Sequence, residues 1–173
     1  MAETHARWDP EGRSAAYAEL EHPSDLFLEI RGHDLPRLFE NALFAFYDQI
    51  AEIQGFEARR ELALRVRAPG LEEALRSLLS EALFQFDTEG FVAAGGHVTV
   101  KGRAGDRPDP ARDGASGQAQ AAVGDWRVVA RLWGDRAHRE RHTLLHEVKA
   151  ITYHRLEVRR TDTGWKATIL LDL

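Results

Sequence analysis

Two residues near the start of the sequence could take part in metal chemistry. His22 and Asp25 flank a proline-containing turn in EHPSDLFLEIRG. A turn of this kind can aim an imidazole and a carboxylate at one point, as a metal site requires. Alternatively, Asp25 caps the turn through its own backbone, and this stretch taken alone favours that simpler role.

The other end of the sequence carries a second pair of acidic groups. Asp172 is the penultimate residue, so its carboxylate lies beside the α-carboxylate of Leu173. Two such groups repel each other at the end of an ordered strand unless a cation or an arginine lies between them. The segment WKATILLDL stays apolar to its last residue, which indicates that this end is held in a sheet.

These two regions can form one site if their strands are neighbours. Carboxylates from Asp25 and Asp172 would then enclose an oxygen-rich pocket, with His22 as a candidate nitrogen ligand and Leu173 contributing its α-carboxylate. Hard cations such as Ca²⁺ or Mg²⁺ prefer oxygen ligands of this kind. Lys149, in HEVKAITYH, would be the one positive group nearby. A solvated lysine on a strand is the alternative interpretation for it.

The composition limits the classes of function. The chain has 173 residues, no cysteine and a formal net charge of −5, so it has room for one domain and offers no thiol nucleophile, disulfide or cysteine-bound metal. The charge argues against a general nucleic-acid binder. Residues 1–15 have mixed charge and no apolar core, which predicts a flexible lead rather than a secretory signal. With no apolar run approaching the ~20 residues of a membrane span, we expect no membrane contact and a cytoplasmic protein.

Helical and strand periodicities alternate in the first half of the chain. The segment DLFLEIRG predicts a strand, and Asp34 is placed to cap a helix that runs from Leu35 to about Ile50. RRELALRVRAPG predicts a second strand, and apolar residues from Leu71 to Phe86 recur at helical spacing.

Strand patterns dominate the second half. Residues 91–100 and 125–134 predict strands, separated by a Gly-, Pro- and Asp-rich stretch that we interpret as a mobile hairpin insertion at about 102–124. YHRLEVRR and WKATILLDL, joined by TDTG, predict a closing hairpin. We therefore expect one α+β domain over residues 16–173, a two-layer sandwich of a mainly antiparallel sheet and two amphipathic helices.

Four ordered stretches resemble the archease family. EHPSDLFLEIRG resembles its His-Thr-Ala-Asp pattern before an amphipathic strand, and LLSEALFQFDTEGFV resembles its central helix and the following turn. VKAITYHRLEV is similar to the family's Lys-Ala-Val-Thr-Tyr-His segment, and GWKATILLDL is similar to its closing strand. The resemblance covers residues 16–173 apart from the insertion. Pro23 and Ser24 depart from the family pattern, and the proline changes how the turn presents His22.

The resemblance implies a non-catalytic accessory protein with a strand–helix–strand–strand fold. Its partner would be an RtcB-type RNA ligase, whose guanylylation and multiple turnover it promotes in tRNA splicing or RNA repair, with RNA contacted only through the ligase. The family's metal-binding acidic pocket falls here on Asp25 and Asp172, with His22 and Leu173 as further ligands, and its lysine falls on Lys149. The implied cofactor is a divalent metal, first calcium, with magnesium or manganese as alternatives.

Two other classes of function remain open from the residues alone. A metal-dependent hydrolase, either a phosphatase or a nuclease, would need a water activated near Asp25 and Asp172, with His22 or His154 as the base. A chaperone-like protein-binding module would bind many clients rather than one ligase. The sequence contains no G-x-S-x-G turn, phosphate-binding glycine loop or H-E-x-x-H helix to indicate a familiar catalytic site.

Overall fold

A computed structural model describes residues 7–102 and 125–173 of the chain. In chain order the elements are β1 (Tyr17–Leu20), β2 (Leu26–Gly32), α1 (Leu35–Ile50), η1 (Ile53–Gly55), β3 (Arg60–Ala68), α2 (Leu71–Glu89), β4 (Phe91–Lys101), β5 (Trp126–Arg136), β6 (Ala150–Ile151), β7 (Glu157–Thr161) and β8 (Gly164–Asp172).

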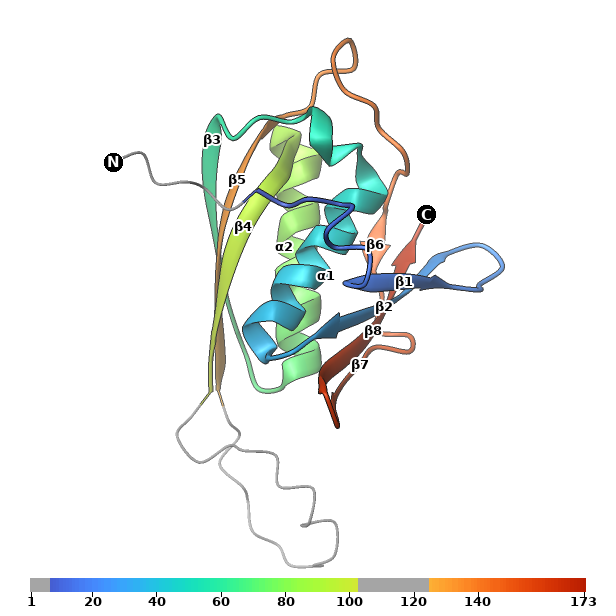
Figure 1. Cartoon of the computed structure of the whole chain (residues 1–173), viewed down its shortest axis with the longest axis vertical. Coiled ribbons are helices and arrows are strands. Elements are labelled where there is room, and N and C mark those ends of the chain that lie inside the picture. Colours follow the sequence, from blue (N-terminus) through green and yellow to red (C-terminus); the bar gives the residue numbers. More distant parts are fainter. Residues whose placement is uncertain (1–6, 103–124) are drawn as a thin grey trace, which may run out of the picture.

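The strands divide between two antiparallel sheets with the helices between them (Figure 1). One sheet has the order β1-β2-β8-β6, with β7 also paired to β8, and the other has the order β3-β5-β4. Helix α1 packs against β2 of the first sheet and β4 of the second, while α2 packs mainly against β3 and β5. The predicted α+β class with antiparallel strands and two helices is confirmed.

The second sheet adds one layer to the two-layer sandwich that was predicted. The burial of helix α1 explains why this layer is needed. From Leu38 to Tyr47 every residue of α1 is buried, so the helix needs apolar cover on opposite sides. A single sheet can cover only one side of a helix. The start of α1 is as predicted, because Asp34 Oδ1 accepts a hydrogen bond from the Arg37 amide at 2.8 Å.

Helix α2 runs three residues further than the apolar pattern predicted. It continues through Asp87, Thr88 and Glu89 and stops at Gly90, whose φ of 68° lies in the left-handed region that favours glycine. The Gly90 amide donates to the Phe86 carbonyl at 2.8 Å, and this bond closes the helix end. The glycine of DTEG is therefore the helix stop and leads directly into β4.

The segment before β1 differs from the flexible lead expected for residues 1–15. Residues 7–15 pack on the domain, and Trp8 is only 1% exposed. The Trp8 ring contacts Phe44 edge-on at 5.9 Å between centroids, and its Nε1 donates to Glu40 Oε1 at 3.2 Å. A single tryptophan among charged residues gives no periodic signal, so the sequence pattern missed this anchor. Residues 1–6 of the expected lead lie outside the described part of the chain.

The C-terminal hairpin forms as predicted, but HEVKAITYH is not a full strand. Only Ala150 and Ile151 of that segment pair, against Asp172 and Leu171 of β8. Tyr153 follows in a turn, exposed, with the Arg76 guanidinium 3.9 Å from its ring centroid. The predicted insertion at 102–124 connects β4 and β5, which pair with each other; beyond Gly102 it lies outside the described residues.

Candidate functional site

The first and last predicted acidic residues meet at one end of the larger sheet. Strand β2 pairs antiparallel with β8, and the register places Leu26 opposite Leu171. Asp25 and Asp172 stand one residue outside this pair on their respective strands. Because side chains alternate along a strand, both carboxylates lie on the sheet face that carries Phe27 rather than on the face covered by the helices.

His22 is held in the turn that precedes Asp25. Its Nδ1 accepts a hydrogen bond from the Asp25 amide at 3.3 Å and lies 3.6 Å from Asp25 Oδ2. Since the amide can only donate, Nδ1 supplies the lone pair, and a neutral ring then carries its proton on Nε2. In this arrangement His22 organises the turn, and it would have to release this bond before Nδ1 could bind a metal.

Lys149 brings a positive charge to the same end of the sheet. Its amide donates to the main-chain oxygen of Asp172 at 2.8 Å, which anchors the residue just before β6. Its side chain turns toward the chain end, and Nζ donates to the main-chain oxygen of Leu173 at 3.1 Å. His22, Asp25, Lys149, Asp172 and Leu173 are therefore gathered in one place, although the sequence separates them into three groups.

A second cation beside this cluster was not predicted from the sequence. The Arg155 guanidinium lies 5.5 Å from the centre of the Phe27 ring, and the His22 ring packs edge-on against the same phenylalanine at 6.4 Å. Thr168 Oγ1 holds the loop by donating to the Arg155 carbonyl at 2.6 Å. Arg155 has a φ of 55°, which a sequence pattern does not reveal for a residue other than glycine.

The donor atoms at this end of the sheet suit a hard divalent cation in chemical type. Asp25 and Asp172 offer carboxylate oxygens, the main chain of Leu173 offers a further oxygen, and both aspartate side chains are only partly covered. Among the described residues, no three or more His, Cys, Asp or Glu side chains form a group able to hold a metal ion. Water would therefore have to complete the coordination of a cation bound here.

Comparison with known proteins supports the sequence resemblance. The model of the Archease protein family (MTH1598/TM1083) matches residues 17–173. The chain belongs to the archease family. This match includes every element from β1 to β8. It also includes the five residues that meet at the end of the larger sheet, which we call the acidic cluster: His22, Asp25, Lys149, Asp172 and Leu173.

Individual archeases match across nearly their full length. The chain is 32% identical to protein archease of Archaeoglobus fulgidus, over 91% of this chain and 98% of that protein. It is 27% identical to protein archease of Methanosarcina mazei, over 91% and 95%. The solution structure of Methanobacterium thermoautotrophicum protein 1598 superposes with a TM-score of 0.67 and 25% identity, over 91% of this chain and 99% of that one.

The helices of this archease give no sign of a membrane span. Neither α1 nor α2, nor any other helix within residues 7–102 and 125–173, combines the length and apolar character needed to cross a bilayer. The cytoplasmic location expected from the sequence stays a prediction.

Proposed function

We propose that this archease is a non-catalytic accessory protein of an RtcB-type RNA ligase, which it activates by promoting ligase guanylylation and multiple turnover. The observation that carries the proposal is the pairing of β2 with β8, which sets Asp25 beside Asp172 and within the same cluster as Lys149. Family membership supports the same function. In this proposal RNA contacts the ligase rather than the acidic cluster.

The cluster has the character of a docking point rather than of an enclosed active site. His22 and Asp25 keep side-chain exposures of 18% and 21%, and Lys149 is exposed, so a partner protein can reach all three. Carboxylates beside an ammonium group present both signs of charge within a few residues. Such a surface complements a cleft that contains both metal ions and nucleotide phosphates, because each charge finds an opposite partner there.

A divalent cation at this point fits the proposal, with calcium as the first choice. Asp25 and Asp172 would hold it, with the main-chain oxygen of Leu173 as a third donor. When bound, it would neutralise two carboxylates and offer positive charge to an anionic group of the ligase. Lys149 keeps its hydrogen bond to the main-chain oxygen of Leu173.

The test is RNA ligation by a cognate ligase in excess RNA substrate, with and without this protein. We expect wild-type protein to convert a single round of ligation into many, and Asp25→Asn and Asp172→Asn each to lose most of that gain. Asp162→Asn is the matched control, since Asp162 is an exposed residue of the β7–β8 turn at the other end of β8.

Thermal unfolding separates loss of function from loss of fold, because all three variants should melt close to wild type. If Asp25→Asn and Asp172→Asn both fold and still restore multiple turnover, the proposed role of the acidic cluster is wrong. Phosphatase and nuclease assays on the protein alone address the hydrolase alternative. Metal-dependent phosphatase or nuclease activity that disappears in Asp25→Asn would replace the accessory role with an enzymatic one.

A further inference from the structure

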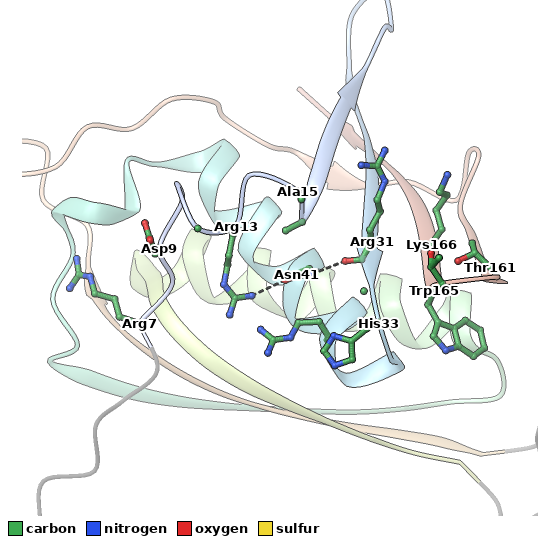
Figure 2. Close-up of a pocket in the computed structure, with 15 residues that line it drawn as sticks. Arg7, Asp9, Arg13, Ala15, Arg31, His33, Asn41, Thr161, Trp165 and Lys166 are labelled. Carbon is green, nitrogen blue, oxygen red and sulfur yellow. Dashed lines mark hydrogen bonds between the residues drawn. The ribbon is translucent and has the colours of Figure 1, made fainter.

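A basic cleft of about 750 Å³ lies away from the acidic cluster (Figure 2). It runs from the N-terminal segment along the start of α1 to the β7–β8 turn. Its lining includes five cations and one carboxylate: Arg7, Arg13, Arg31, Arg37, Lys166 and Asp9. A volume of this size is typical of sites for ligands as large as a nucleotide.

The basic cleft carries a surplus of positive charge because its cations share their partners. Glu29 Oε1 accepts from Arg31 Nη2 at 2.6 Å and also lies 3.3 Å from Lys166 Nζ. The hydrogen bond from Arg31, and then the contact with Lys166, lower the pKa of Glu29 below its usual value of 4.5. One carboxylate therefore faces two cations that both line the cleft.

Glu40 is shared in the same way. Its Oε1 accepts from Arg13 Nη2 at 2.6 Å and lies 3.6 Å from Arg37 Nη1. Four cations thus share two carboxylates, and the chain as a whole has the opposite sign, with a net charge of −5. The local positive field of the basic cleft therefore attracts anions, although the protein as a whole is acidic.

The guanidinium groups differ in how freely they can meet a ligand. Arg13 is fixed between Glu40 and Asn41, whose Oδ1 accepts from its Nη1 at 2.7 Å. The Arg37 side chain is 41% exposed and keeps donors for a ligand beyond its contact with Glu40. Arginine donors in this state match phosphate oxygens in pairs. Arg31 is bound to Glu29, and with Lys166 it extends away from Trp165 and Arg13 in Figure 2, so these two cations contribute to the field rather than to a direct contact.

The end of the cleft nearest the β7–β8 turn offers a different chemistry. The Trp165 indole lies there, with Thr161 beside it in Figure 2 and Thr163 also on the lining. Trp165 is partly exposed. A planar aromatic face next to hydroxyl groups and guanidinium groups suits a ligand that combines a base, a sugar and a phosphate.

The basic cleft and the acidic cluster are separate sites. Asp25 precedes β2 and Asp172 ends β8, whereas Arg31 and Lys166 stand near the opposite ends of the same two strands. At ~3.3 Å a residue, the length of β2 separates the two sites by roughly 20 Å. One wall of the cleft, formed by Arg7, Asp9 and Arg13, precedes the residues that match the family model.

We propose that the basic cleft binds a nucleoside phosphate, with Arg37 on the phosphate and Trp165 on the base. The ligand is either a free nucleotide or the end of an RNA strand, and both present the same phosphate and ring. This inference does not depend on the proposed role with the ligase, because it uses none of the residues of the acidic cluster.

The test is titration calorimetry of the full chain with adenosine 5′-monophosphate, inorganic phosphate and a short single-stranded RNA, at about 50 mM and 200 mM salt. We expect the nucleotide to bind more tightly than inorganic phosphate and to weaken as salt rises. Arg37→Gln should weaken nucleotide binding roughly tenfold, since it removes a charge-assisted contact. Trp165→Leu should weaken binding of the nucleotide but not of phosphate.

Arg65→Gln is the matched control for charge, because Arg65 is exposed on β3 in the other sheet. RNA binding that is tighter than nucleotide binding, and lost in the same variants, would assign the ligand to a strand end. Equal binding by wild type and Arg37→Gln would overturn the proposal, as would equal loss in Arg65→Gln or no binding at low salt. Asp25→Asn should bind the nucleotide as wild type does.

Discussion

Asp25 and Asp172 are neighbours across β2 and β8, one residue beyond the Leu26–Leu171 pair, although almost the whole sequence lies between them. The partners on the buried face of this pairing are apolar, and Leu28 and Ile169 face each other there, both completely buried. A one-residue slip of β8 would turn those side chains to the wrong face, so the register is strongly specified. The position of the two carboxylates is therefore fixed by the core beneath them.

Lys149 should matter for function and not for stability. Its Nζ makes one exposed hydrogen bond, to the main-chain oxygen of Leu173, so Lys149→Met should change the free energy of unfolding by less than about 0.5 kcal/mol. We expect the same variant to lower activation of the ligase about tenfold, the equivalent of one charged contact. Lys101→Met, at an exposed position on β4, serves as the control in the turnover assay. Full activation by Lys149→Met would remove the lysine from the mechanism.

Divalent metal should stabilise the folded protein through the two aspartates. A ligand at ~100 times its Kd adds about 2.7 kcal/mol to the free energy of unfolding, so calcium should raise Tm by several degrees and a chelator should reverse the rise. The gain should vanish in Asp25→Asn/Asp172→Asn and persist in Asp162→Asn. An equal rise in the double variant would show that the metal acts elsewhere on the protein.

Trp8 should contribute strongly to stability despite its place near the chain start. Its buried ring packs on Phe44 and Tyr47, so Trp8→Ala should cost about 3–5 kcal/mol in chemical denaturation. Phe84→Ala is the comparison, because Phe84 is 56% exposed and its loss should cost less than about 0.5 kcal/mol. Similar denaturation midpoints for Trp8→Ala and wild type would instead support the flexible N-terminal lead expected from the sequence.

Glu29 should make stability depend on pH in the acid range. Its pKa is lowered in the folded state, first by the hydrogen bond from Arg31 and then by Lys166. The resulting stability is present above the usual pKa of 4.5 and is lost as pH falls through the lowered value. Glu29→Gln should therefore be less stable than wild type at neutral pH, by at most about 1 kcal/mol, and this difference should shrink below pH 4.5. A difference that grows on acidification would contradict this assignment.

Local patterns in the sequence predicted the elements well where one side of an element is buried. Asp34 at the start of α1 is an example, because a helix cap depends on three or four adjacent residues. The alternation in β8 also held, with Ala167, Ile169 and Leu171 buried. The division into two sheets was missed because α1 is covered on opposite sides, and a helix pattern does not tell which strands supply each cover.

Side-chain geometry at the two sites was less accessible from sequence. The grouping of His22, Asp25 and Asp172 was predicted because a strand that is apolar to its end has to pair somewhere. Arg155 was missed, since its place depends on a left-handed backbone in a turn. The basic cleft was missed as well, because Arg13 and Lys166 meet only after an N-terminal segment, a helix and a hairpin have packed together.

The pairing of β2 with β8 also sets the order in which this protein can be completed during synthesis. Residues 35–136 hold both helices and all strands of the three-stranded sheet. These elements follow one another closely in the chain, so each leaves the ribosome soon after the element that it packs against. Strand β2 has to wait for β8, which at 5–20 residues per second takes on the order of 10 s. Until then Leu28 and Ile30 have no strand on the β8 side of β2, so the nascent chain exposes an unpaired apolar strand edge that can bind other chains. Slow decoding of the codons for β8 would prolong that exposure and lower the yield of folded protein.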